Sequence, residues 1–157
     1  IFVAGGIGRG EAIVQFLKMG AAGCQLGTRF VCANESIAHE NFKNVFLKSQ
    51  ARNTMVSQQI DETFPVIPVR AIANKGTYEF TKIQRKAIDE YQNGKLSKEE
   101  AQLMIEKFWA GALRKAVIDG DIEFGSVMAG QSVGMVSEKQ NVDEIIKELV
   151  AQIHKTY

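Results

Sequence analysis

The sequence contains few of the residues that indicate a metal site, a disulfide scaffold or a membrane span. Among its 157 residues are two cysteines, two histidines, two prolines and one tryptophan. Cys24 and Cys32 lack the spacing of a metal-binding motif, so no metal ligand is expected, and a reducing, cytosolic setting fits best. No run of about eighteen apolar residues is present, so the sequence predicts no membrane span.

Neither sign of charge is in excess. The net charge of +1 argues against the strong positive field that attracts nucleic acid. A hydrophobic share of 45% and a charged share of 24% are typical of a globular domain.

Two phosphate-binding motifs are also missing. The early glycines do not form G-x-G-x-x-G in any register because position 11 is Glu11, and no G-x-x-x-x-G-K-[ST] occurs.

Residues 1–30 form the most informative stretch, with two strand-and-glycine units joined by a helix. Ile1–Ala4 is an apolar run suited to a strand buried on both faces, and Gly5–Gly6 ends it. Apolar residues at helical spacing follow, and Gly23–Leu26 is the second expected strand. A strand, a short helix and a second strand predict two parallel strands.

Parallel strands end at the same edge of a sheet, so two glycine turns should lie side by side there. These are Gly5–Gly6 and Gly27–Thr28, which we call the paired turns. Their exposed N–H groups, the N-terminus of the helix after Gly6 and the Thr28 hydroxyl suit a phosphate. A recurrent phosphate site of (β/α)₈ barrels follows strands 7 and 8. From the residues alone, the alternative to a phosphate site is equally open. In that alternative, Gly5–Gly6 is only a tight turn and Gly27–Thr28 is only the end of a strand.

The motif A-G-G-I at Ala4–Ile7, followed by G-A-A-G-C-Q-L-G-T-R-F at Gly20–Phe30, resembles the flavin-phosphate region of the nitronate monooxygenase family. The resemblance implies an α/β fold: the C-terminal part of a TIM (β/α)₈ barrel with its last two strands and an appended, mostly helical subdomain. It implies FMN as cofactor, with NAD(P)H as a possible electron donor. The cofactor-binding residues that it implies are Ala4, Gly5, Gly6, Gln25, Leu26, Gly27 and Thr28. The family's catalytic histidine precedes the A-G-G-I turn, so the catalytic residue is expected upstream of Ile1.

The remaining chain is predicted to be largely helical. Helices are expected over 34–48, with Asn34 or Ser36 as N-cap, and over 77–92. Ser97 and Glu100 form a capping box that opens a further helix to about residue 118. The expected division is 1–33 for the barrel strands, 34–118 for the helical subdomain, and 119–157 for a segment that packs back on the barrel.

The glycine-rich stretch 120–134 carries a second part of the resemblance. It is similar to the segment G-D-x-x-x-G-S-x-M-A-G-Q of the family's enoyl-acyl-carrier-protein reductase II branch. Ser126 is a candidate N-cap of a helix rich in small residues. The resemblance implies that Ser126, Met128, Ala129 and Gly130 lie on the substrate side.

Several functions remain open. The leading expectation is FMN-dependent oxidation of alkyl nitronates with O₂, and the alternative is NAD(P)H-dependent reduction of an enoyl chain on acyl carrier protein. A phosphate-binding barrel without flavin and a non-catalytic interaction module are the other candidates. The expected partners are a small-molecule substrate or a carrier-bound acyl chain, together with the N-terminal part of the barrel. No nucleic acid or membrane is expected, and a homodimer is left open.

Overall fold

The structure, a computed structural model, describes residues 1–156 and divides them into two compact units. The first unit contains Ile1–Asn53 and the chain from Ala129 onward, and the second contains Thr54–Met128. Residues 34–53 and 54–118 therefore belong to different units, whereas the sequence groups them in one helical subdomain.

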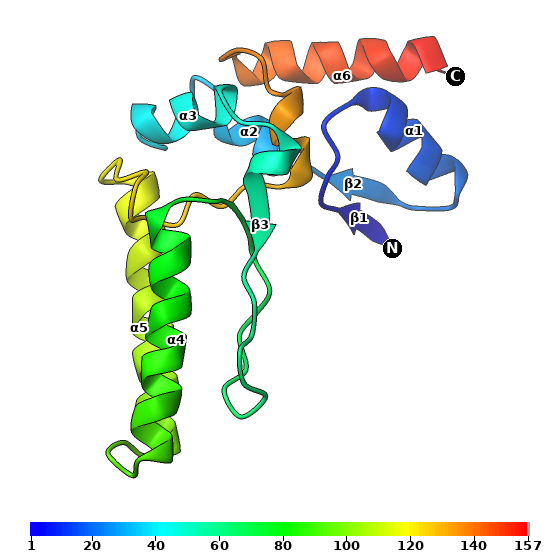
Figure 1. The fold of residues 1–157 in the computed structure, drawn as a ribbon. Helices are drawn as coiled ribbons and strands as arrows, with labels where there is room; N and C mark the ends of the chain where they lie inside the picture. Colours follow the sequence, from blue (N-terminus) through cyan, green and yellow to red (C-terminus); the bar gives the residue numbers. More distant parts are fainter. Residues whose placement is uncertain (157) are drawn as a thin grey trace. The chain divides into compact units, whose positions relative to one another are not determined.

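A parallel strand pair opens the first unit. Strand β1 (Phe2–Ala4) pairs with β2 (Gly23–Gln25), and α1 (Gly10–Lys18) connects them (Figure 1). This confirms the predicted strand–helix–strand unit. The expected burial of the first strand on both faces is wrong for this chain. Phe2 is 72% exposed, because β1 pairs with β2 alone among the described residues.

Short helices complete the first unit. They are α2 (Thr28–Val31), α3 (Glu40–Leu47), the 3₁₀ helices η1 (Ala51–Asn53) and η2 (Gln131–Met135), and the C-terminal α6 (Val142–Thr156). Helix α6 packs against α1, and its Ile145 and Leu149 form a buried cluster with Ala33.

Helix α3 begins later than the sequence predicts. Its N-cap is His39, whose Nδ1 accepts a hydrogen bond from the N–H of Asn41 at 3.1 Å. Asn34 and Ser36 are therefore wrong as N-cap candidates. Asn34 instead donates from its side chain to Asn141 at 2.7 Å.

The second unit is a helical hairpin beside a short antiparallel ladder. Strands β3 (Thr54–Val56) and β4 (Arg70–Ile72) pair, and helices α4 (Lys75–Gln92) and α5 (Lys98–Val117) pack side by side (Figure 1). The buried core residues are Phe64, Phe80, Ala87, Ile88, Ala101 and Ile105. The capping box at the start of α5 is confirmed, with both reciprocal hydrogen bonds present.

The segment Ser126–Met128 is extended, so the helix predicted to begin at Ser126 is wrong. The backbone N–H of Ile72 donates to the carbonyl of Val127 at 2.9 Å, and Met128 forms an antiparallel bridge with Ala71. These contacts continue the β4 ladder and exclude helical geometry. The next helical residues are those of η2.

Few of the residues 1–156 lie in strands. They form two two-stranded sheets and do not close a barrel. Over the same residues, every helix is too short or too polar to cross a membrane.

Candidate functional site

The paired turns lie at one edge of the parallel sheet. Ala4 is opposite Gln25 in the register, so Gly5–Gly6 and Gly27–Thr28 follow directly at that edge. Gly5 and Gly6 have φ values of 90° and 70°, a region in which side chains are strained. A Cβ built on either glycine, or on Gly27, would meet nothing within 4 Å. The backbone of both turns is therefore open to a ligand, as a phosphate site requires.

Gly130 comes to the paired turns from the far end of the sequence. Its backbone N–H donates to Oγ1 of Thr28 at 2.9 Å. A Cβ built on Gly130 would lie 3.1 Å from that oxygen and 3.7 Å from the nitrogen of Gly6. Thr28 accepts in this bond, so its own hydroxyl proton remains available for donation to a ligand. Gly6, Thr28 and Gly130 thus form one cluster.

The remaining predicted phosphate-side residues take supporting positions. Ala4 and Gln25 are the last residues of β1 and β2. Leu26 packs its side chain against the buried cluster around Leu149. These three residues set the position of the turns, and Leu26 can offer only its backbone to a ligand.

The helix after Gly6 offers fewer free backbone N–H donors to a ligand than the sequence predicts. Helix α1 begins only at Gly10, and the Gly10 N–H donates to Oε1 of Gln152 at 2.7 Å. That donor is therefore used within the fold. Beside Gly6, an open depression of about 380 Å³ of water-accessible space is lined by Gly8, Arg9, Glu11, Ala12 and Met135.

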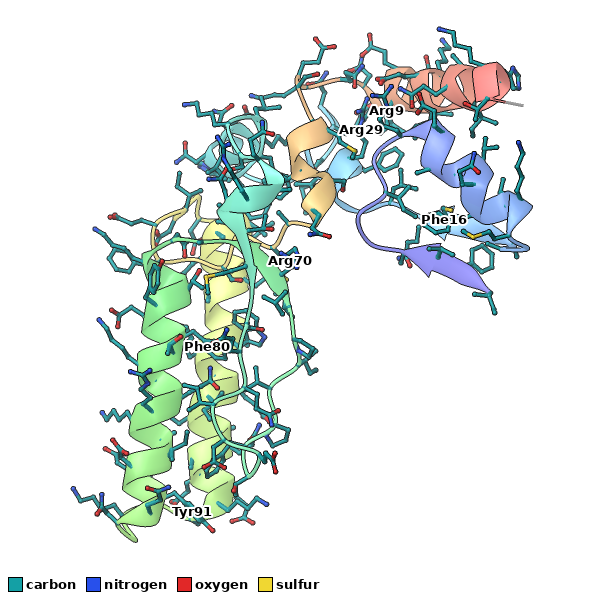
Figure 2. All side chains as sticks on the ribbon, turned by 45° about the vertical axis from the view of Figure 1, so that its right-hand side comes forward. Arg9, Phe16, Arg29, Arg70, Phe80 and Tyr91 are labelled. Carbon is teal, nitrogen blue, oxygen red and sulfur yellow. The ribbon has the colours of Figure 1, made fainter. Side chains whose placement is uncertain are left out.

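Arg29 is a site-supporting residue that the sequence interpretation missed. Its buried guanidinium donates to the carbonyl of Met135 at 3.1 Å and to Oε1 of Gln140 at 2.9 Å (Figure 2). It also forms an ion pair with Glu148 of α6. The available signal was a charged residue inside the otherwise apolar turn after β2. Arg29 joins α2 to η2, so it fixes the two segments that carry Thr28 and Gly130.

The four predicted substrate-side residues do not share one environment. Ser126 is buried beside a pocket of the second unit, and Met128 bridges to β4. Ala129 is buried in the first unit, and Gly130 lies beside the paired turns. Gly130 is thus placed with the predicted phosphate-side residues.

No acid–base centre stands out in the described part of the chain. Residues 1–156 hold no group of three or more His, Cys, Asp or Glu side chains that suits a metal ion. Burial raises the pKa of the Cys32 thiol to about 11, although Lys43 and Lys139 oppose that shift. Cys32 is therefore protonated at neutral pH and is unsuited to act as a nucleophile.

These turns and their glycine neighbour form an open end of a parallel βα unit. The chain matches the sequence model of the nitronate monooxygenase family over residues 1–152, and it belongs to that family. A probable nitronate monooxygenase of Staphylococcus saprophyticus is 27% identical over 156 residues, which are 99% of this chain and 39% of the relative. A nitronate monooxygenase of Neurospora crassa is 26% identical, over 95% of this chain and 36% of that protein.

Solved structures agree with this assignment. FabK from Thermotoga maritima has a TM-score of 0.77 and 30% identity, over 99% of this chain and 44% of FabK. Nitroalkane oxidase from Streptomyces ansochromogenes has a TM-score of 0.66 and 22% identity, over 99% of this chain and 39% of that one, and it shows likeness of fold. These neighbours are TIM-barrel proteins, so the structure is consistent with part of such a barrel. The chain spans about two fifths of the length of the curated relatives.

Proposed function

We propose that this chain supplies the FMN phosphate site of an oxidoreductase that oxidises alkyl nitronates with O₂. The observation that carries the proposal is the cluster of Gly6, Thr28 and Gly130 at the open edge of the parallel strands. The family is FMN-dependent in general. FMN, when bound, supplies the redox chemistry, and the protein binds and orients it.

The residues present fit a phosphate. The backbone at Gly6 and Gly27 is unobstructed, so phosphate oxygens can approach the peptide N–H groups. The Thr28 hydroxyl adds a donor while its oxygen is held by the Gly130 N–H. Ala4 and Gln25 hold the two turns in register through the strand pair, and Gly5 and Leu26 are the residues that follow them. In this proposal, the donors to the phosphate are at Gly6, Gly27 and Thr28, and the Gly130 N–H holds the Thr28 hydroxyl in place.

A second reaction is supported by one specific comparison. FabK from Thermotoga maritima is 30% identical to the chain, and the family's reductase branch has a segment like Ser126–Gly130. The alternative function is therefore NAD(P)H-dependent reduction of an enoyl chain on acyl carrier protein. Anaerobic mixing with NADH separates the two. Rapid bleaching of the flavin by NADH, with no response to an alkyl nitronate, would eliminate the monooxygenase.

The proposal includes further partners. The other strands of the barrel would cover β1, because Phe2 is now 72% exposed and apolar. The substrate would be a small nitronate or, for the alternative, a carrier-bound acyl chain.

Two other candidate functions predict a colourless purified protein. They are a barrel that binds a phosphorylated metabolite without flavin and a non-catalytic interaction module. Flavin absorbance bands in that protein would exclude both.

The site is tested by adding side chains at the turns. Gly6→Val and Gly27→Val should each prevent phosphate approach and lower FMN affinity at least tenfold, measured by flavin fluorescence. Gly94→Val is the matched control for strain, because Gly94 has a φ of 69° in the α4–α5 turn and Gly6 has 70°. Gly27, the N-cap of α2, has a φ of −101° and tolerates valine in its backbone. Unchanged FMN affinity in both site variants would show the assignment to be wrong.

A further inference from the structure

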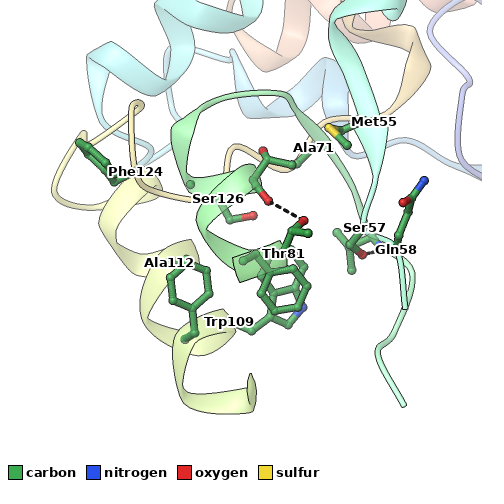
Figure 3. A pocket seen from close by; sticks show the side chains of 14 residues that line it. Met55, Ser57, Gln58, Ala71, Thr81, Trp109, Ala112, Phe124 and Ser126 are labelled. Carbon is green, nitrogen blue, oxygen red and sulfur yellow. Dashed lines mark hydrogen bonds between the residues drawn. The ribbon is translucent and has the colours of Figure 1, made fainter. Parts of the chain in front are cut away.

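The second unit contains a pocket between the helical hairpin and the β3–β4 ladder (Figure 3). Aromatic side chains from both helices form one wall, where the rings of Phe80 and Trp109 stack with their centroids 4.8 Å apart. All lining residues belong to Thr54–Met128, so the pocket is a feature of the second unit alone. The apolar lining is completed by Met55, Val69, Ala71, Phe108, Ala112 and Phe124.

The free space in this pocket is small. About 30 Å³ is open to water-sized molecules, which is room for about two waters. A flavin ring, a sugar or a chain of several carbon atoms is too large for that space, whereas a molecule of two atoms fits. The size of the pocket therefore restricts its ligand to the smallest molecules.

The lining offers little to a polar occupant. The hydroxyl groups of Ser57, Thr77 and Thr81 each donate to an acceptor within the second unit, at 3.2, 3.1 and 3.4 Å. Ser126 Oγ is fully buried and does not face the free space. Gln58, the remaining polar side chain of the lining, is exposed and can bind bulk water instead.

These features disfavour both water and ions in the pocket. A buried water needs two or more polar partners, and a void with an apolar lining stays dry and accepts apolar guests. The lining contains no ionisable side chain, so a charged ligand would be desolvated without a partner. The occupant that fits is therefore small, uncharged and apolar.

We propose that this pocket binds molecular oxygen, O₂. A two-atom molecule without charge gains dispersion contacts with the aromatic wall and the other apolar side chains, and these contacts require no polar partner. The choice of O₂ among small apolar molecules rests on the proposed function, because nitronate oxidation consumes it. The binding itself is independent of FMN, since no residue of the paired turns lines the pocket.

The paramagnetism of O₂ provides the measurement, because O₂ speeds the relaxation of the protons that it contacts. Methyl relaxation of the purified, ¹³C-labelled protein is compared by NMR under nitrogen and under several pressures of O₂. The methyl groups of Ala71 and Ala112 line the pocket, whereas that of Ala87 is buried in the same unit and does not line it. The increase in relaxation rate should be at least about threefold larger for Ala71 and Ala112 than for Ala87.

Two matched variants complete the test. Ala112→Leu adds three carbon atoms at the pocket and should remove the excess relaxation at Ala71. Ala151→Leu makes the same change at an exposed position of α6 and should leave that excess unchanged.

The wild-type chain alone can overturn the proposal. Equal O₂ effects on the methyl groups of Ala71, Ala112 and Ala87 would do so, and so would nuclear Overhauser effects that place a held water against Ala71 or Ala112. These results stand even if Ala112→Leu does not fold. The measurement uses neither flavin nor nitronate, so a negative result here leaves the FMN site untouched, and a failure to bind FMN leaves the O₂ result untouched.

Discussion

Arg29 and Glu148 form an ion pair that joins the turn after β2 to the C-terminal helix α6. The Arg29 side chain is 7% exposed and that of Glu148 is 37% exposed, so the two charges are desolvated unequally. Arg29 also bonds to the carbonyl of Met135 in η2. The pair therefore stabilises the region in which Thr28 meets Gly130.

The first prediction follows from this unequal burial. Glu148→Gln leaves the buried Arg29 charge without its counter-ion and should lower the free energy of unfolding by about 3 kcal/mol. Arg29→Met leaves Glu148, which can regain water, and should cost less, about 2 kcal/mol. The measurement is urea unfolding followed by circular dichroism.

The control is an exposed pair on the same helix. Asp143 and Lys147 form an ion pair with side chains that are 72% and 74% exposed. Such pairs contribute little, so Asp143→Asn should leave the unfolding midpoint almost unchanged. If Asp143→Asn were as destabilising as Glu148→Gln, burial would not be the cause of the effect.

The second prediction concerns the hydrogen bond between Thr28 and Gly130. Thr28→Val keeps the shape of the side chain but removes the acceptor of the Gly130 N–H and the donor proposed for phosphate. FMN affinity should fall about tenfold, which corresponds to about 1.4 kcal/mol. Thr28→Ser keeps the hydroxyl and should retain FMN within about twofold of wild type. Flavin fluorescence titration measures both, and an equal loss in the two variants would contradict the role of the hydroxyl.

Local chemistry made part of this structure predictable from the sequence. The parallel strands, the positive φ at Gly5 and Gly6 and the capping box at Ser97 each depend on residues close in sequence. The contact between Thr28 and Gly130 joins residues 102 positions apart, so no spacing rule reveals it. Ser126 failed as an N-cap because pairing of its segment with β4 outweighed its local preference.

The burial of two residues near the site, Arg29 and Phe2, could not be predicted from the sequence. Arg29 is a charged residue in an otherwise apolar turn, and its contacts with α6 and η2 accompany its burial. Phe2 was expected in a buried strand, but it is exposed, because β1 pairs with β2 alone among the described residues.

The third prediction contrasts two glycines of the second unit. A Cβ at Gly125 would lie 2.4 Å from the carbonyl oxygen of Asp121 and 2.5 Å from the nitrogen of Ala116. Both are backbone atoms, so Gly125→Ala should destabilise the protein by about 2 kcal/mol or more. Gly111, inside α5, has open space at its Cβ position, and Gly111→Ala should stabilise by about 0.5–1 kcal/mol.

Thermal unfolding measures the two changes, with opposite shifts of Tm expected. Gly111→Ala also serves as the control, because it adds the same methyl group without a clash. A decrease in Tm for both variants would mean that the helix at Gly111 is constrained by something other than its backbone.

The fourth prediction concerns the two thiols. Cys24 is partly exposed in β2, whereas Cys32 is buried and burial raises its pKa to about 11. Thiolate is the reactive form, so Ellman's reagent at pH 8 should modify Cys24 quickly and Cys32 only on unfolding. Cys24→Ala should remove the fast phase, and Cys32→Ala the phase that requires denaturant. Equal rates for the two thiols in the folded protein would contradict the burial of Cys32.

The raised pKa of Cys32 also gives a pH dependence of stability with a definite sign. The folded protein retains the Cys32 proton up to a pKa of about 11, while the unfolded chain loses it near the ordinary thiol pKa of 9.0. Between these values the unfolded state binds fewer protons, so the free energy of unfolding falls as pH rises, and the stabilisation is fully present below about pH 9. Cys32→Ala should flatten the decline between pH 9 and 11, whereas Cys24→Ala should leave it unchanged. Urea unfolding at several pH values tests this, and an identical decline in wild type and Cys32→Ala would assign it to other groups.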